Sequence, residues 1–368
     1  GCEAGRCAVN ADNSIFIGSA AGKCACNASD GNLFIGINAG RGSSTLTDNT
    51  GDYNIAFGKN ALLGFTSGSN NVAIGHSAAC SLTSGSDQVM IGKGAGANYT
   101  AGTSSIFIGK YAGCTFATTS NFNILLGNQA GKCRSSGGSN IGIGLCALLG
   151  SSTTGDNTGS GNISLGDESG QCLASGSYNI FFGRCSGKCI STGNCNVSIG
   201  HKAMSGGTIT GSRNVAIGEN AALCLSGGFY NVMFGFNAGK CIQTGGNNVA
   251  IGACAGLKNT GQGGNVFIGG SAGCNSTGSC NVFIGLNAGE KQGGYSYNTY
   301  IGHKAACDQS QGSNNVAIGF NVCLPVSTGN AASKQLAIGQ NSKQWIVGNC
   351  NYNVGIGTTN PIATLLEP

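Results

Sequence analysis

Short apolar segments of three residues recur along this chain of 368 residues, and each is preceded by a polar residue and closed by glycine. Clear copies of this N-V-A-I-G pattern start at Asn71, Asn248, Asn281 and Asn315. We name the three apolar places the first, middle and last strand positions, and the closing residue the repeat glycine. The repeat glycines are Gly18, Gly36, Gly58, Gly75, Gly92, Gly109, Gly127, Gly144, Gly166, Gly183, Gly200, Gly218, Gly235, Gly252, Gly269, Gly285, Gly302, Gly319, Gly339 and Gly357.

The spacing of the repeat glycines indicates the architecture. Most neighbouring repeat glycines are about 17 residues apart, a period typical of solenoids. The gaps before Gly58, Gly166 and Gly339 are longer. A unit of this length is too short for a propeller blade or a helical repeat, but it suits one coil of a parallel β-solenoid. The sequence therefore predicts an all-β protein, a parallel β-solenoid of about twenty coils of about 17 residues, in which stacking makes the core continuous.

The alternation of side chains predicts two faces for each strand. The last position is Ile, Leu or Phe in every copy, and the first position is aliphatic in every copy except Thr299. Because alternate residues of a strand share a face, we expect the first and last positions to be buried. The repeat glycine would end the strand at a bend that a side chain would obstruct.

The middle position would then point outwards, and half of the copies carry a large apolar side chain there. An apolar stripe of this kind indicates contact with other copies of the chain, most simply in a bundle of three. The alternative is that the strand lies between two layers of the same chain. The aromatic candidates for oligomer contact are Phe16, Phe34, Phe107, Phe181, Phe267, Phe283 and Tyr300.

The polar residue before each strand is Asn in most copies. A polar residue held in register predicts an amide ladder in which each side chain bonds its neighbours along the stacking direction. The alternative is that Asn serves only as a turn former. The representative ladder residues are Asn71, Asn248, Asn265, Asn281 and Asn315.

Composition narrows the class of protein. The chain has 68 Gly, 8% charged residues and a net charge of +5. Regular Val/Ile segments argue against disorder, and the thin positive charge argues against a nucleic-acid groove. No apolar run approaches the length of about 18 residues that a membrane helix needs, so we expect no membrane insertion. Twenty cysteines favour an oxidising, extracellular setting.

The cysteines follow the repeat. Residues one coil apart stack directly, so cysteines in adjacent coils fall near bonding distance. Bonds between chains remain an alternative for others, such as Cys80. The predicted disulfides between coils are Cys172–Cys189, Cys224–Cys241, Cys114–Cys133 and Cys307–Cys323.

The search for chemistry predicts neither an enzyme nor a metal or cofactor site. All three His residues directly follow a repeat glycine, but Lys, Asp, Arg and Glu take the same place in other copies, which indicates a solvated position. No Ser/His/Asp arrangement or phosphate loop is present. Acidic residues in the two long insertions, Asp48, Asp52 and Asp156, would make Asx turns or, alternatively, bind a cation or a glycan.

The unit N-V-A-I-G-x-x-A resembles the head repeats of trimeric autotransporter adhesins and the repeats of tail-fibre proteins of bacteriophages and other large viruses. The stretch from Asn353 to Pro368, which includes G-I-G-T-T-N-P, is similar to the segment that follows such repeats in phage fibres, often ahead of a self-cleaving chaperone domain. The resemblance implies a left-handed β-roll trimer. The abundant cysteines depart from the pattern of both families. The long coil departs from the adhesin pattern and favours the viral fibre.

We therefore expect a structural extracellular fibre, the shaft of a viral or phage tail fibre or spike involved in host attachment, on the virion surface. The alternatives are a cell-surface adhesin or secreted filament subunit and, ranked last, an ice-binding solenoid. The expected partners are further copies of the chain, as a homotrimer or filament, and a host-surface receptor or glycan. We expect residues 1–345 to form the solenoid, and residues 346–368 the last coil and a tail leading to a missing or cleaved segment.

Overall fold

The computed structural model describes residues 1–8, 11–25, 30–43, 49–116, 120–151, 157–324, 333–341, 343–349, 351 and 354–357. These residues form strands and turns and no helix, in a parallel β-solenoid of about 18 turns of ~17 residues. The predicted fold class is thus confirmed. The chain divides into two compact units, Gly1–Asn194 and Cys195–Pro368.

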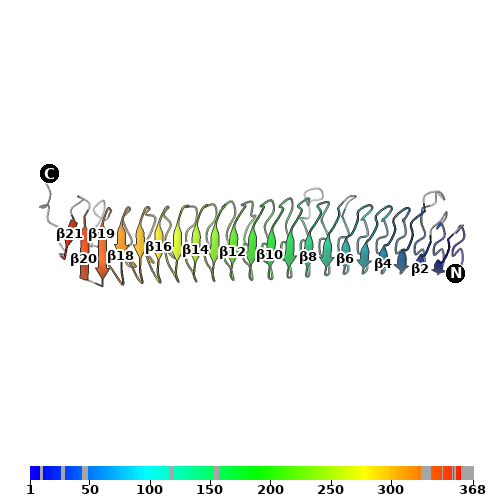
Figure 1. Ribbon diagram of the computed structural model, residues 1–368, viewed down its shortest axis with the longest axis horizontal. Coiled ribbons are helices and arrows are strands. Elements are labelled where there is room, and N and C mark those ends of the chain that lie inside the picture. The colour runs from blue at the N-terminus through cyan, green and yellow to red at the C-terminus, as the bar shows by residue number, and fades with distance from the viewer. Residues whose placement is uncertain are drawn as a thin grey trace. The chain divides into compact units, whose positions relative to one another are not determined.

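In the first unit, each strand pairs in parallel with the next along the chain, and the paired residues occupy the same strand positions (Figure 1). For example, Val72 lies opposite Val89, and Ile74 lies opposite Ile91. The strands are β1 (Ile15–Ile17), β2 (Leu33–Ile35), β3 (Ile55–Phe57), β4 (Val72–Ile74), β5 (Val89–Ile91), β6 (Ile106–Ile108), β7 (Ile124–Leu126), β8 (Ile141–Ile143), β9 (Ile163–Leu165) and β10 (Ile180–Phe182).

In the second unit, parallel pairing runs from β11 to β19, and β20 and β21 then continue the sheet in antiparallel order. The strands are β11 (Val197–Ile199), β12 (Val215–Ile217), β13 (Val232–Phe234), β14 (Val249–Ile251), β15 (Val266–Ile268), β16 (Val282–Ile284), β17 (Thr299–Ile301), β18 (Val316–Ile318), β19 (Leu336–Gln340), β20 (Lys343–Gly348) and β21 (Val354–Ile356).

The end of the second unit differs from the last coil that was predicted, together with a C-terminal tail, within residues 346–368. Parallel stacking ends with β19, and Ile346 of β20 lies opposite both Ile338 and Ile356 in antiparallel pairs. Residues 343–347, after Gly339, read K-Q-W-I-V, a strand-forming run that follows a turn at Asn341 with φ of 51°. The chain therefore folds back as a strand. Asn353 and residues 358–368 lie outside the described residues.

The repeat glycines adopt a conformation that other residues avoid. Gly92 has a φ of +132°, and a Cβ there would lie 2.6 Å from the carbonyl oxygen of Gly109 in the next coil. Gly109 meets Gly127 in the same way. Close backbone stacking at this bend therefore requires glycine, as the sequence predicts.

The amide ladder is present in both units. In the second unit, Asn265 donates from its backbone N–H and from Nδ2 to Oδ1 of Asn248, each at 3.1 Å, and Asn248 bonds Oδ1 of Asn231 in the same way. The backbone N–H of Asn281 donates to Oδ1 of Asn265 at 2.9 Å. These side chains are buried, so the ladder satisfies polar groups that would otherwise be costly.

The same bonds are made at the other representative positions. In the first unit, Asn71 donates from Nδ2 to Oδ1 of Asn54 at 3.0 Å and to the carbonyl oxygen of Gly85 at 2.8 Å. In the second unit, the backbone N–H of Asn315 donates to Oδ1 of Asn298 at 2.9 Å. Each amide therefore ties its own coil to the coils on either side.

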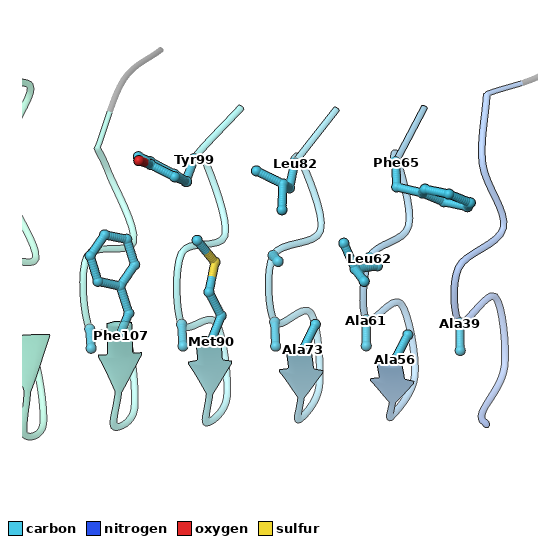
Figure 2. Close-up of a cluster of buried hydrophobic side chains, with 14 of the residues drawn as sticks. Ala39, Ala56, Ala61, Leu62, Phe65, Ala73, Leu82, Met90, Tyr99 and Phe107 are labelled. Atoms are coloured by element: carbon cyan, nitrogen blue, oxygen red, sulfur yellow. The ribbon is translucent and has the colours of Figure 1, made fainter. Parts of the chain in front are cut away.

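The two faces of the strands are the reverse of the sequence-based assignment. The middle position is buried in every strand from β2 to β18, whereas the first and last positions are partly or fully exposed. Figure 2 shows Met90 and Phe107 pointing from their strands into the coil, while Phe65, Leu82 and Tyr99 enter from the opposite side. Alternation was predicted correctly, but it does not tell which of the two faces is turned inwards.

The inner side is packed by matching residue sizes. Where the residue at the middle position is large, the residue six places later is usually glycine. A Cβ at this glycine would collide with the large side chain; at Gly113, for example, it would lie 2.7 Å from the ring of Phe107. Where the middle position is Ala56, the residue six places later is Leu62, which is fully buried. In these coils the size of the middle residue is therefore compensated within the same coil. Elsewhere the next coil compensates, as where a Cβ at Gly256, in the coil of Ala250, would lie 2.6 Å from Phe267.

Candidate functional site

The outer face of the strands is the candidate functional surface. In the first unit, both outer residues of every strand are aliphatic or Phe, and none of them is buried. Ile15, Ile17 and Phe57 are the most open, with 54%, 55% and 54% of their surface exposed. Because the strands pair in register, these side chains form two continuous apolar rows.

The second unit repeats this surface from β11 to β18, with Thr299 as its one polar outer residue. The surface is widest at β13, where Val232 and Phe234 are both exposed and Phe236 adds a further ring beyond the repeat glycine. Contiguous apolar surface of this kind is uncommon on a monomer and is typical of surfaces that contact other molecules.

The residue after the repeat glycine borders the outer face and is mixed in character. Lys59, Lys93 and Glu219 are exposed there. His201 shares this position and lies 3.6 Å from Glu219, from Nδ1 to Oε1, and His303 stacks on Phe320 with ring centroids 5.1 Å apart. Among the described residues, no three His, Cys, Asp or Glu side chains come together as a metal ion would require.

The aromatic residues predicted to contact other copies lie inside the coils. Their rings pack on each other: Phe283 and Tyr300 stack at 4.7 Å, and Phe267 lies 5.5 Å from Phe283. Phe16 is partly buried against the core of the first unit. The oligomer-contact assignment of these side chains is therefore wrong, because they are the core filling. The fully buried members are Phe34, Phe107, Phe181, Phe267, Phe283 and Tyr300.

The eight predicted disulfide cysteines are free thiols in the structure, and each predicted pair lies on adjacent coils close enough to interact electrostatically. Burial raises the pKa of Cys189, and the neighbouring Cys172 raises it further. The pKa of Cys224 is raised by burial and then by Cys241. Burial also raises the pKa of Cys114, and its predicted partner Cys133 makes a smaller contribution. The pKa of Cys307 is raised in the same way by burial, with a smaller contribution from Cys323.

Asp52 is the only one of the three insertion acids within the described residues, since Asp48 and Asp156 lie outside them. Its Oδ1 accepts the backbone N–H of Asp30 at 2.8 Å, and Oδ1 of Asp30 accepts the N–H of Asp12 at 2.9 Å. These carboxylates bind backbone N–H groups of neighbouring coils, so they join coils and do not make the local bonds of an Asx turn.

Arg134 is a buried charge that was not predicted from the sequence. It lies seven residues after a repeat glycine, where other coils place Phe65, Leu82 or Tyr99, and none of its surface is exposed. Its Nη2 donates to the carbonyl oxygen of Gly159, while Nε and Nη1 have no partner among the described residues. Burial lowers the pKa of Arg134 to about 10. Counting positions from the glycine would have revealed it.

A fifth cysteine pair was also missed. Cys7 and Cys24 have the same separation in sequence as Cys172 and Cys189, and the N–H of Cys7 donates to the carbonyl oxygen of Lys23 at 3.0 Å. The separation itself was the available signal.

Comparisons with protein-family models, with curated proteins and with solved structures found no match to this chain. None of the described segments forms a helix long and apolar enough to cross a membrane.

Proposed function

We propose that this chain is a subunit of a structural extracellular fibre, the shaft of a viral or phage tail fibre or spike, and that its copies pack together through the outer face. The observation that supports this proposal is the constancy of that face. Its first and last positions stay Val, Ile, Leu or Phe in nearly every coil while remaining partly exposed.

A second copy of the chain is the partner that fits this surface best. Parallel strands lie about 4.8 Å apart, so the apolar rows repeat with that period. A compact partner would match a few coils only, whereas another solenoid with the same repeat matches the rows coil by coil. Side-by-side packing of copies would bury the apolar rows along a fibre and leave the mixed position after the repeat glycine at the border with solvent.

The resemblance to tail fibres and adhesin heads favours three copies around a common axis, and it supports the extracellular location. Two copies packed face to face, with their sheets about 10 Å apart, would cover the same rows. The mass of the assembly separates the two arrangements, because one chain has a mass of 36.4 kDa.

The test replaces two exposed outer residues of adjacent coils, as Phe234→Lys with Ile251→Lys. The matched control places the same charges at exposed residues of the same two coils outside the outer face, as Gln243→Lys with Thr260→Lys. Light scattering should give three times 36.4 kDa for the wild type and the control and a smaller mass for the outer-face variant. A wild type that stays at 36.4 kDa at every concentration would contradict the proposal.

Location is tested separately. Antibodies against the purified chain, carrying gold label, should decorate fibres on virus particles in electron micrographs. Decoration of cell surfaces instead would favour a cellular adhesin or filament.

A further inference from the structure

Two of the four predicted cysteine pairs stand in strict register. In the first unit, Ile163 lies opposite Ile180, and the same separation in sequence places Cys172 opposite Cys189. In the second unit, Val215 lies opposite Val232, which places Cys224 opposite Cys241. Both members of each pair lie six residues after their repeat glycines.

The backbone fixes the two pairs in the same way. The N–H of Cys172 donates to the carbonyl oxygen of Lys188 at 2.9 Å, and the N–H of Cys224 donates to that of Lys240 at 2.9 Å. In both pairs the acceptor residue directly precedes the second cysteine. The two backbones are therefore joined beside the thiols, and disulfides form between residues whose Cα atoms are about 4.4–6.8 Å apart, a range that includes the spacing of adjacent strands.

Two other pairs show what a shift in register does. Ile106 lies opposite Ile124, a separation one residue longer than in the first two pairs, so the partner of Cys114 is Lys132 and Cys133 lies one residue beyond it. Cys114 Sγ instead points to the carbonyl oxygen of Lys132 at 3.9 Å.

The pairing of Thr299 with Val316 places Cys307 opposite Leu324, one residue after Cys323. A shift of one residue turns a side chain to another direction, so these two pairs are less suited to bonding.

We propose that Cys172–Cys189 and Cys224–Cys241 form disulfides between adjacent coils, one in each unit, with glutathione disulfide or a similar small disulfide as the oxidant. One protein thiolate attacks the small disulfide, forms a mixed disulfide and releases one glutathione. The second protein thiolate attacks the protein sulfur of that mixed disulfide, forms the S–S bond and releases the second glutathione. Two protein thiols are oxidised, the glutathione disulfide is reduced to two thiols, and the released glutathiones carry the two protons.

Each bond would close a loop that is one coil long and hold two coils together covalently. The fraction of each thiol that is deprotonated sets the rate, because only the thiolate attacks. Burial raises the pKa of Cys189 and of Cys224, so bond formation should accelerate as the pH rises above neutrality. The pairing holds whether or not copies of the chain assemble into a fibre.

The test incubates the full chain with oxidised and reduced glutathione, blocks the remaining thiols and digests with trypsin. Cleavage after Lys188 and Lys240 separates the cysteines of each pair, so mass spectrometry detects each disulfide as two linked peptides. We expect the links Cys172–Cys189 and Cys224–Cys241 at high yield. The link Cys114–Cys133 should be at least tenfold rarer. The link Cys307–Cys323 lies within one tryptic peptide, where it is detected as the loss of two hydrogens, and it should be equally rare.

A register-moving variant provides the matched control. Thr115 donates its N–H to the carbonyl oxygen of Lys132, as Cys172 does to Lys188, so Cys114→Ala with Thr115→Cys moves the thiol into register with Cys133. This variant should gain a link to Cys133, and Cys189→Ser should lose only the link to Cys172. Absence of both proposed links from the wild type, or equal yields for in-register and shifted pairs, would overturn the inference.

Discussion

The two faces of the same strands follow different rules. On the inner face the middle position ranges from Gly142 to Phe107, and the residue six places later changes size to match. On the outer face the first and last positions keep nearly the same residues from coil to coil, although they stay partly exposed. Packing within one chain therefore accounts for the inner face, whereas it does not account for the constancy of the outer face.

The largest difference between the faces should appear on truncation to alanine. Phe107 is fully buried and packs against Tyr99 and Phe116 at 5.4 and 5.5 Å, so Phe107→Ala should cost about 3–5 kcal/mol of unfolding free energy. Ile108, its neighbour on the outer face, is 38% exposed, and Ile108→Ala should cost below about 1 kcal/mol at low concentration.

Urea unfolding at several protein concentrations measures both variants. A cost for Ile108→Ala that grows with concentration would sharpen the comparison, because it would mean that assembled copies cover the outer face. Equal costs for the two variants in dilute solution would break it.

The next effect concerns the charge on the inner side. Arg134→Leu restores the apolar type found at the equivalent position in other coils. It removes a buried guanidinium of which two nitrogens have no partner among the described residues. Replacing a buried charge by a fitting apolar side chain stabilises proteins by about 1–4 kcal/mol. Calorimetry should therefore show a higher Tm. Arg134→Lys, which keeps a buried charge, is the matched control and should show no gain.

A pair of substitutions with an intermediate effect on stability tests the size matching directly. Ala73→Phe alone overfills its coil and should cost about 1–3 kcal/mol. Adding Ala79→Gly, six places later, recreates the combination of Phe107 with Gly113 and should recover part of that loss. Ala79→Gly alone is the control. No recovery in the double variant, measured by urea unfolding, would show that the matching is not a packing rule.

The smallest effect comes from a charge pair that belongs to neither face. Lys188 Nζ lies 2.9 Å from Oε2 of Glu168 and is the main cause that lowers the pKa of this carboxyl. Because the pKa is lowered, the charge pair stabilises the fold at pH values above the ordinary pKa near 4.5. This stabilisation is lost as the pH falls through the lowered pKa. Both groups are about one-third exposed, so the loss should be at most about 1 kcal/mol. Comparing Lys188→Met with wild type at pH 7 and pH 3 measures it.

The repeat, the strands, the glycine bends and the amide ladder could be predicted from the sequence, because glycine and asparagine recur at fixed places in the coil, as at Gly92 and Asn248. It was not sufficient to tell which face of the strands points inwards, since the alternation of side chains is the same for both orientations. The inward direction could have been inferred from the residue six places after the middle position, because Gly113 and Leu62 compensate in size for Phe107 and Ala56. The antiparallel end was missed because V-G-I-G at residues 354–357 imitates a coil in sequence alone.

The register between coils also bears on how a gene for such a chain can change. Strands β2 and β3 pair in register across the long gap before Gly58, and β15 and β16 do so across the shortest gap between repeat glycines, so length differences are absorbed between strands. An insertion inside a strand would exchange its inner and outer side chains. Duplication or loss of a whole coil keeps every glycine, amide and face in place. The length of this chain can thus evolve in steps of one repeat, while its repeat glycines tolerate little substitution.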